Sequence, residues 1–309
     1  MTDPQNWERQ TIEKLAFSSL QEARRARNWS IFFKTLTFVY LFALLFLAME
    51  WIGPASGSLG PHTALIDIDG EIGVTAEVSA DNTLASLRAA FDDKHTKGVI
   101  LRINSPGGSP VQAGIINDEI RRLRKTHPKI PLYAVIEDIC ASGGYYIAVA
   151  AEKIYVDKAS IVGSIGVLMD GFGFTGTMQK MGVERRLLTA GENKGFMDPF
   201  LPVNPAHKTH AQIMLNEIHQ QFIKVVRDGR GTRLKETPEM FSGLFWSGEK
   251  SIELGLADAI GNSGTVARDV IKEENIVDFT THEGLADRFA KRFGASMAHS
   301  LLGSGFSLR

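Results

Sequence analysis

The sequence has almost no cysteine and almost no net charge, and both scarcities narrow the possible classes of protein. Cys140 is the single cysteine among 309 residues, so an intrachain disulfide framework is excluded. Lys and Arg number 34 against 35 Asp and Glu, and this near balance gives no reason to expect a nucleic-acid partner. No internal repeat of useful length appears. The length therefore predicts one large domain with an appendage.

A serine lies where a buried strand is expected to turn into a helix. Residues 131–137 are apolar and predict a strand, and the small residues of 143–151 predict a helix, so Ser142 lies at a helix N-terminus. Backbone N–H groups at such an end are unpaired, and the helix dipole favours negative charge there. An attacking serine at this position is close to groups that stabilise an oxyanion. Ser142 is therefore a candidate nucleophile, and Cys140 is expected to be a small buried side chain beside it.

The sequence offers no obvious histidine to activate this serine. Lysine can replace histidine as a base where burial lowers its pKa toward the working pH. Lys194 lies in the Gly-rich stretch 191–195 and is followed by the largely apolar residues 196–201, unlike the many lysines in charged runs. It is the candidate base, although a loop lysine taken alone is seldom catalytic. Four histidines lie in or beside polar helical stretches and are expected to be solvated, namely His127, His207, His210 and His219.

A Pro-Gly-Gly turn forms a second candidate element of the site. Residues 98–103 predict an apolar strand that runs into Pro106-Gly107-Gly108, before a helical pattern that extends to residue 126. Glycines at the carboxyl end of a strand let backbone N–H groups approach a ligand closely, which suits an oxyanion hole. For a Gly-Gly pair on its own, an ordinary strand-to-helix turn remains the alternative.

Four segments resemble, in order, the signal peptide peptidase A family in its short, single-repeat form. They are residues 103–108, 141–146 and 160–166 and the loop that contains Lys194. The match is collinear and spans roughly residues 62–280. In that family a serine and a downstream lysine form the catalytic pair, and the resemblance implies that Ser142 is the nucleophile and Lys194 the general base.

The resemblance also implies supporting roles around this pair. Ser164 is expected to hydrogen-bond and orient the lysine amine. The oxyanion donors are expected to be the N–H groups of Gly107 or Gly108, together with that of Gly143. No cofactor and no metal are implied.

The same layout is similar to the Clp protease and crotonase superfamily, an α/β fold of repeated β-β-α units. The alternation of strand and helix patterns independently predicts an α/β sheet with mainly parallel pairing. Further strands are expected at residues 62–69, 153–156, 165–169 and 184–189, and further helices at residues 81–93, 204–230 and 238–242.

A mostly apolar run near the N-terminus predicts a single transmembrane helix. It spans residues 31–52, with Lys34 able to snorkel and Trp29 and Trp51 suited to the interfaces. A signal-peptide core and a buried soluble helix are the alternatives. Retention is favoured over cleavage because the run begins about 30 residues into the chain and Ala48-Met49-Glu50 is a poor small-x-small site. Arginines precede the run, whereas residues 53–61 carry no charge, so the N-terminus is expected in the cytoplasm. The expected location is the bacterial inner (cytoplasmic) membrane, with an extracytoplasmic catalytic domain.

These patterns divide the chain into five parts. Residues 1–30 are expected to be a cytoplasmic segment with a short amphipathic helix, 31–52 a signal-anchor helix and 53–61 a linker. Residues 62–280 are expected to form the peptidase domain. Residues 281–309 form an amphipathic tail that is expected to dock on protein, with membrane-surface contact as the alternative.

Two classes of function remain open from the sequence. The first is a membrane-anchored serine endopeptidase that uses the Ser-Lys dyad to degrade cleaved signal peptides and other extended peptides. The second is a non-proteolytic crotonase-like protein, either an acyl-thioester enzyme or a membrane-bound scaffold, in which Ser142 and Lys194 are structural. The resemblance further implies that short family members form homo-oligomeric rings in which the dyad is shared between subunits.

Overall fold

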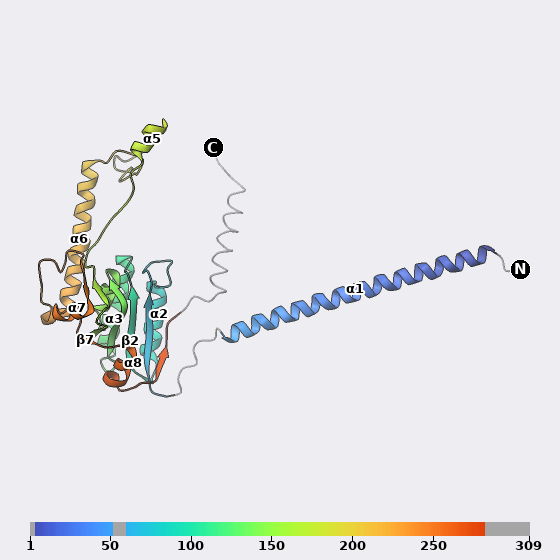
Figure 1. Cartoon of the computed structure of the whole chain (residues 1–309), viewed down its shortest axis with the longest axis horizontal. Coiled ribbons are helices and arrows are strands. Elements are labelled where there is room, and N and C mark those ends of the chain that lie inside the picture. The colour runs from blue at the N-terminus through green and yellow to red at the C-terminus, as the bar shows by residue number, and fades with distance from the viewer. Residues whose placement is uncertain (1–3, 52–59, 282–309) are drawn as a thin grey trace. The chain divides into compact units, whose positions relative to one another are not determined.

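The computed structural model describes residues 4–51 and 60–281, which belong to two compact units, Met1–Ser56 and Gly57–Arg309 (Figure 1). The predicted linker at residues 53–61 lies mostly outside the described residues. The amphipathic tail predicted for residues 281–309 lies outside them except for residue 281.

The first unit is a single helix, α1 (Pro4–Trp51), of 48 residues. The expected separate helices before and within the apolar run are thus one continuous helix. At 1.5 Å per residue it is about 72 Å long, more than twice the hydrocarbon thickness of a bilayer of about 30 Å. The stretch Glu13–Leu45 is long and apolar enough to cross a membrane by length and composition, and none of it is buried within the structure.

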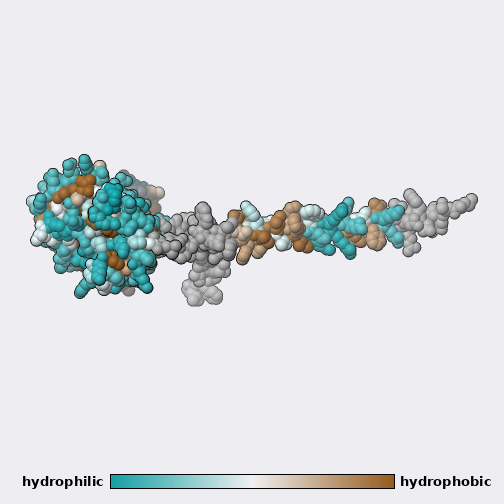
Figure 2. Space-filling view, turned by 90° about the horizontal axis from the view of Figure 1, so that it is seen from below, coloured by the Kyte–Doolittle hydropathy of each residue, from teal (hydrophilic) through white to brown (hydrophobic). Residues whose placement is uncertain are grey.

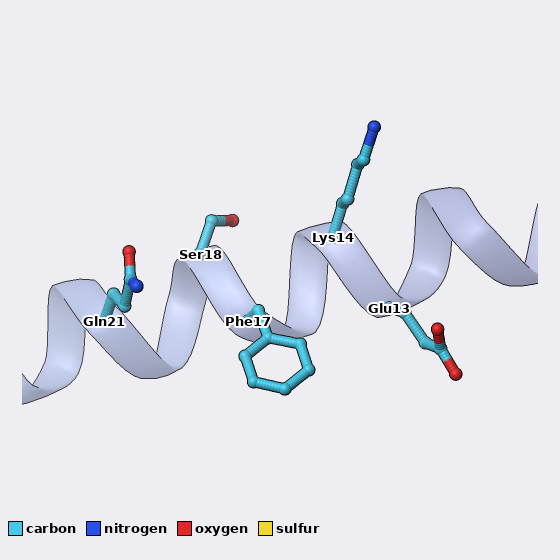
Figure 3. Close-up of a pocket in the computed structure, with 5 residues that line it drawn as sticks. All are labelled: Glu13, Lys14, Phe17, Ser18 and Gln21. Carbon is cyan, nitrogen blue, oxygen red and sulfur yellow. The ribbon is translucent and has the colours of Figure 1, made fainter.

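The helix is polar in its earlier part and apolar in its later part. Figure 3 shows Glu13, Lys14, Ser18 and Gln21 projecting from the early part, with Phe17 between them. Figure 2 shows a mostly hydrophilic stretch followed by a hydrophobic one along the same helix. In the hydrophobic stretch the large apolar side chains between residues 31 and 45 are exposed around the helix. A helix that is apolar on all sides requires an apolar surrounding that this unit does not provide.

The second unit is built on one eight-stranded sheet. Its main path has the order β6-β5-β3-β2-β1-β8, and β4 joins β3 to β7 beside that path. Every pairing is parallel except that between β5 and β6. The strands are β1 (His62–Asp69), β2 (Thr96–Ser105), β3 (Leu132–Ala141), β4 (Lys153–Val156), β5 (Ile161–Gly163), β6 (Phe245–Ser247), β7 (Ala259–Ile260) and β8 (Ile276–Asp278).

Helices follow most of the strands and cover the sheet. Helices α2 and α3 begin at serine N-caps, Ser79 and Ser109, whose hydroxyls accept hydrogen bonds from backbone N–H groups three residues later. The helices are α2 (Ala80–Asp92), α3 (Pro110–Thr126), α4 (Gly143–Ala148), α5 (Thr175–Met181), α6 (Pro205–Arg230), α7 (Gly248–Glu253) and α8 (Ser263–Thr265), with a 3-10 turn at Gly231–Arg233 and a π turn at Val266–Ile271.

Successive side chains of the central strands point alternately into two apolar cores, one on each face of the sheet. In β1, Ala64, Ile66 and Ile68 belong to the large core that includes α2, α3 and α4, whereas Leu65 belongs to a smaller core beneath the π turn. The same alternation occurs in β2, where only Ile100 joins the smaller core. Because successive side chains point to opposite faces, a strand buried on both faces has a continuous apolar sequence. The predicted α/β class and the mainly parallel pairing are confirmed.

Three predicted elements are wrong. Residues 165–169 and 184–189 are not strands, and residues 238–242 form turns rather than a helix. Residues 165–169 and 184–189 have sequence patterns typical of strands. However, β5 ends at Gly163, and no strand among residues 60–281 pairs with either segment. A strand needs a neighbour for its backbone N–H and C=O groups, and these segments have none within one chain.

A buried arginine fixes the end of α6 against the C-terminal part of the sheet. Arg230 is 1% exposed and donates two hydrogen bonds to the carboxylate of Asp258 and one to the Gly255 carbonyl. The same carboxylate accepts from the N–H of Ile154 at the start of β4. Burial would raise the pKa of Asp258, but the hydrogen bonds and charge of Arg230 outweigh it and hold that pKa below its usual value.

We predict that Arg230→Met lowers the free energy of unfolding by about 3–5 kcal/mol, because it leaves a buried carboxylate without its main partner. Urea unfolding of the full chain in detergent measures this. Arg227→Met is the control: Arg227 also lies in the last turn of α6, but its ion pair with Glu236 is exposed and should contribute about 1 kcal/mol or less. Equal losses in the two variants would contradict the prediction.

The pH dependence provides a second readout of the same contact. A carboxyl with a depressed folded pKa stabilises the fold above its unfolded pKa of about 3.9, and this contribution disappears as the pH falls through the folded pKa. The loss of stability below about pH 4 should therefore be smaller in Arg230→Met than in the wild type.

Candidate active site

Ser142 occupies a strained turn between β3 and α4. Its φ of 51° and ψ of −120° are unusual for a residue with a side chain and cost about 1–3 kcal/mol. The Ser142 N–H donates to the Gly163 carbonyl at 2.9 Å, and the Ser142 carbonyl accepts from the Tyr146 N–H at 2.9 Å. These bonds fix the turn, while the Ser142 hydroxyl has no hydrogen bond to any described residue.

The parallel register of the sheet places Ser164 beside Ser142. In the pairing of β3 with β5, Ala141 lies opposite Gly163, so each serine directly follows the last residue of its strand. Ser164 also has a φ of 51°, and its N–H donates to the Leu244 carbonyl at 2.8 Å, just before β6. The two serines thus leave the same edge of the sheet with the same positive φ.

The Pro-Gly-Gly turn lies at this edge because β2 pairs with β3, with Ser105 opposite Cys140. A Cβ atom on Gly107 would lie 2.7 Å from the Ser142 Cβ and 2.8 Å from the Gly143 nitrogen. A Cβ atom on Gly108 would lie 2.1 Å from the carbonyl oxygen of Ile72. Both glycines also have positive φ angles, 106° and 141°. The turn therefore has room for glycine only.

The hydrogen bonds of this turn distinguish its two glycines. The Gly107 N–H donates to the Ser105 Oγ at 3.2 Å. The Gly108 N–H has no acceptor among the described residues, and neither has the Gly143 N–H at the start of α4. A Cβ atom on Gly143 would lie 3.3 Å from the Gly108 nitrogen, so these two free donors are neighbours. Of the two expected alternatives, the geometry favours Gly108 over Gly107 as an oxyanion donor.

These residues open into a cleft of about 980 Å³ between α3 and α6. Ser142, Ser164, Gly108 and Gly143 all line it, so the structure brings together four of the six residues expected from the sequence, and Gly107 lies directly behind them. Cys140 is fully buried, as expected, and burial raises the pKa of its thiol. Among residues 13–45 and 60–281, no group of three or more His, Cys, Asp or Glu side chains is placed to hold a metal.

Lys194 is the expected site residue that does not join the others. It lies in an exposed turn at residues 191–197, and no lysine lines the cleft around Ser142. The turn belongs to the segment between β5 and α6, and Figure 1 shows α5 of this segment beyond the end of α6 that points away from the sheet. The expected burial of the lysine amine is therefore not achieved within one chain.

The lysine turn is itself held in place, by contacts that the sequence pattern did not reveal. His207 Nε2 lies 3.0 Å from the Asn193 Oδ1, and the ring of Phe196 lies 5.1 Å from that of His207 and 5.9 Å from that of His210. Two histidines expected to be merely solvated thus support the turn from the first part of α6. Their spacing of three residues on one helix face was the available signal.

Residues 166–203, which we call the lysine segment, expose many apolar side chains. Leu168 and Phe172 are each 80% exposed and Leu188 is 97% exposed. The segment folds on itself through the stacked rings of Phe174 and Phe200 and encloses a second cavity of about 930 Å³. Exposed apolar surface of this extent usually marks a protein–protein contact.

An α/β sheet that presents a strained serine next to free backbone N–H groups is the site of a serine hydrolase. Residues 124–277 match the model of peptidase family S49. The chain belongs to this family, the family of signal peptide peptidase A. The family resemblance and the fold class expected from the sequence are confirmed, and the match supports the prediction of a serine peptidase.

Two of three similar proteins have names that agree with this assignment, and the third is named as a transporter. A protein of Enterococcus faecium whose name assigns it as signal peptide peptidase SppA is 32% identical over 202 residues, 65% of this chain and 58% of that protein. Protease 4 of Haemophilus influenzae is 32% identical over 206 residues, 64% of this chain and 32% of that protein. The Na(+)/H(+) antiporter NhaA of Brucella abortus is 44% identical over 191 residues, 62% of this chain but 26% of that protein.

The chain thus spans between about a quarter and three fifths of the length of these relatives. The antiporter match concerns one segment of a much longer protein, and it carries no transport function over to this chain.

We predict that Gly107→Ala slows labelling by a fluorophosphonate, a serine-directed probe, by about a hundredfold or more, because the new methyl group would displace the Ser142 turn and its oxyanion donors. Gly70→Ala is the control: Gly70 also has a positive φ of 90°, but a Cβ atom there meets nothing within 4 Å. The control should lose stability from backbone strain and keep its labelling rate. Labelling of Gly107→Ala at the wild-type rate would contradict the assignment of this turn.

Proposed function

We propose that this protein is a membrane-anchored serine endopeptidase in which Ser142 is the nucleophile and Lys194 the general base. The observation that carries the proposal is the strained Ser142 turn, with the free N–H groups of Gly108 and Gly143 in the same cleft. A serine hydroxyl needs a base to become a nucleophile at neutral pH. No histidine lines the cleft, and His219, the one in the adjoining part of α6, contacts the Ile165 carbonyl.

In the proposed reaction, the neutral amine of Lys194 takes the proton of the Ser142 hydroxyl as its Oγ bonds to the substrate carbonyl carbon. The negative charge that forms on the carbonyl oxygen accepts hydrogen bonds from Gly108 and Gly143. The C–N bond then breaks, and the lysine returns the proton to the leaving amine. Water hydrolyses the acyl-serine by the same steps, and Ser164 positions the lysine amine through its hydroxyl.

The proposal assigns Lys194 to a neighbouring copy of the chain. Three observations support this: the cleft lacks a lysine, Lys194 is exposed, and the lysine segment exposes apolar side chains that a neighbour would cover. Covering by a neighbour would also desolvate the amine, which favours its neutral form. A contact between two different surfaces of identical chains must close into a ring to remain finite, so we propose a homo-oligomeric ring.

The proposed substrates are signal peptides after their release into the membrane, and other extended peptides. The cleft is lined mainly by apolar and small residues, which suits the apolar cores of such peptides. The exposed apolar part of α1 would anchor the enzyme in the bilayer where these substrates lie. Because Arg24, Arg25 and Arg27 precede the apolar part, the proposed orientation leaves the catalytic unit outside the cytoplasm.

We predict that Ser142→Ala, Lys194→Ala and Lys194→Arg each lower the hydrolysis of an apolar, internally quenched peptide by about 10³-fold or more. Arginine fails because its guanidinium does not release its proton in proteins. Ser164→Ala should show a smaller loss, since it orients the base without reacting. An active Lys194→Arg enzyme would exclude the dyad, and hydrolysis that persists in Ser142→Ala would exclude Ser142 as the nucleophile. A folded wild type that hydrolyses no peptide would favour the crotonase-like protein without peptidase activity.

We predict that co-assembled Ser142→Ala and Lys194→Ala chains regain part of the activity that each lacks alone. Some contacts then combine an intact serine with an intact lysine from different copies. Activity is measured after the two detergent-solubilised proteins are dissociated and reassembled, with native mass spectrometry to verify mixed oligomers. Mixed oligomers without activity would place the dyad within one chain.

A further inference from the structure

Among residues 60–281, one charged side chain lines the cleft around Ser142, that of Asp118. The other lining residues are glycines, prolines, apolar residues, serines, a tyrosine and a glutamine. Asp118 takes no part in the proposed bond cleavage. A carboxylate in such a cleft is the group that most strongly distinguishes a basic substrate side chain from a neutral or acidic one.

Asp118 lies on the face of α3 that forms one wall of the cleft. Val111, Gly114, Ile115 and Asp118 all line it and are spaced as successive turns of one helix face. The face begins at Pro110, two residues after the free N–H of Gly108. Asp118 is eight positions after Pro110, which corresponds to about 12 Å along the helix axis. The wall is thus apolar near the serine and acidic farther along.

The opposite side of the cleft is mostly apolar. Ile218 and Phe222 of α6 line it, and the ring of Phe222 packs at 5.1 Å against that of Tyr146. Gln221 supplies the one uncharged amide. A peptide between α3 and α6 would therefore contact apolar surface along most of its length and meet its one fixed charge at Asp118.

Within the described part of the chain, the Asp118 carboxylate forms no hydrogen bond and no ion pair, and its side chain is exposed to the cleft. Its charge does act on Tyr146: burial raises the pKa of that phenol, and the negative charge of Asp118 raises it further. Arg121, three residues later, is engaged elsewhere: its guanidinium donates to the Asn117 Oδ1 at 2.8 Å and to the Val225 carbonyl at 3.4 Å. The acidic charge is therefore available to a ligand in the cleft.

We propose that Asp118 is a specificity-determining residue that selects peptides with a lysine or arginine three to five residues from the scissile bond. An extended chain advances about 3.3 Å per residue, so about four residues span the roughly 12 Å of α3 between Pro110, which follows the oxyanion turn, and Asp118. The inference rests on the proposed peptidase function. It narrows the substrate class to apolar peptides with a basic residue at a fixed distance from the cleaved bond.

A lysine scan tests this inference on the full chain in detergent. Internally quenched apolar peptides carry glutamine at every scanned position, and a single lysine or glutamate replaces one glutamine at a time. The measured quantity is the ratio of kcat/KM for the lysine peptide to that for the glutamine parent, within each variant. The wild type should show a two- to fivefold preference for lysine at one position three to five residues from the bond, and high salt should reduce it.

Two variants of Asp118 and one control variant distinguish an effect of the Asp118 charge on the kcat/KM ratio from an effect of altered structure. Asp118→Asn should remove the lysine preference, and Asp118→Lys should replace it by a preference for glutamate at the same position. Glu274→Gln removes one exposed carboxylate outside the cleft and should keep the wild-type ratio. A lysine preference that persists unchanged in Asp118→Asn overturns the inference. A second outcome also overturns the inference: the Asp118→Lys oligomer dissociates while the kcat/KM ratio of lysine to glutamine peptides stays unchanged. That result would mean that Asp118 pairs with a neighbouring copy of the chain rather than with the substrate.

Failure of this inference is distinguishable from failure of the proposed function. Ser142→Ala must abolish hydrolysis of the glutamine parent if the function is right, whatever the lysine scan shows. If hydrolysis depends on Ser142 but lysine is preferred at no scanned position, the proposed peptidase function is retained and the proposed role of Asp118 is wrong.

Discussion

The parallel pairing of β3 with β5 is the constraint on which the candidate site depends. With Ala141 opposite Gly163, the chain leaves the sheet at Ser142 and Ser164 side by side, and the Ser142 N–H donates to the Gly163 carbonyl. A slip of one residue would turn every side chain of β5 to the other face and separate the two serines. The register is fixed because Val162 and Cys140 are fully buried, and a buried set tolerates no slip. The strain at both serines persists because the surrounding core determines the backbone there.

The last part of the chain supports this arrangement from the side. Strand β6 pairs with β5, and the Leu244 carbonyl before it accepts from the Ser164 N–H. The buried hydroxyl of Tyr145, three residues after the candidate nucleophile, donates to the Leu256 carbonyl at 2.8 Å. The adjacent Asp258 receives Arg230 from the end of α6. Hydrogen bonds thus join α4, the end of α6 and residues 244–258 to one another and to β5, which gives the fixed backbone that a preorganised site requires.

The site and its proposed base differ in physical character. Ser142 lies between the buried residues Ala141 and Gly143, whereas Lys194 lies in a segment whose apolar side chains are exposed and in which residues 165–169 and 184–189 have no strand partner among residues 60–281. Exposed apolar side chains and backbone groups without a strand partner are suited to contact with another chain. The proposed sharing of the dyad would make catalysis depend on assembly. The orientation of the cleft between α3 and α6, with its acidic end at Asp118, would then determine which peptides are cleaved.

The sequence by itself determined the α/β class, the strands that precede both turns, and the position of Ser142 between a strand and a helix, because apolar runs bounded by glycine and small residues are local signals. It could not separate Gly107 from Gly108, since the choice depends on the hydroxyl of Ser105, which engages one N–H and leaves the other free. It predicted strands at residues 165–169 and 184–189 because their pattern suits a sheet, while the absence of a pairing neighbour is a property of the tertiary structure. The cleft and its single carboxylate depend on the tertiary placement of α3 and α6 on either side of it, and the separation of Lys194 from Ser142 depends on the course of the segment between β5 and α6. The sequence shows which reactive side chains the chain contains, but long-range packing decides which of them come into contact.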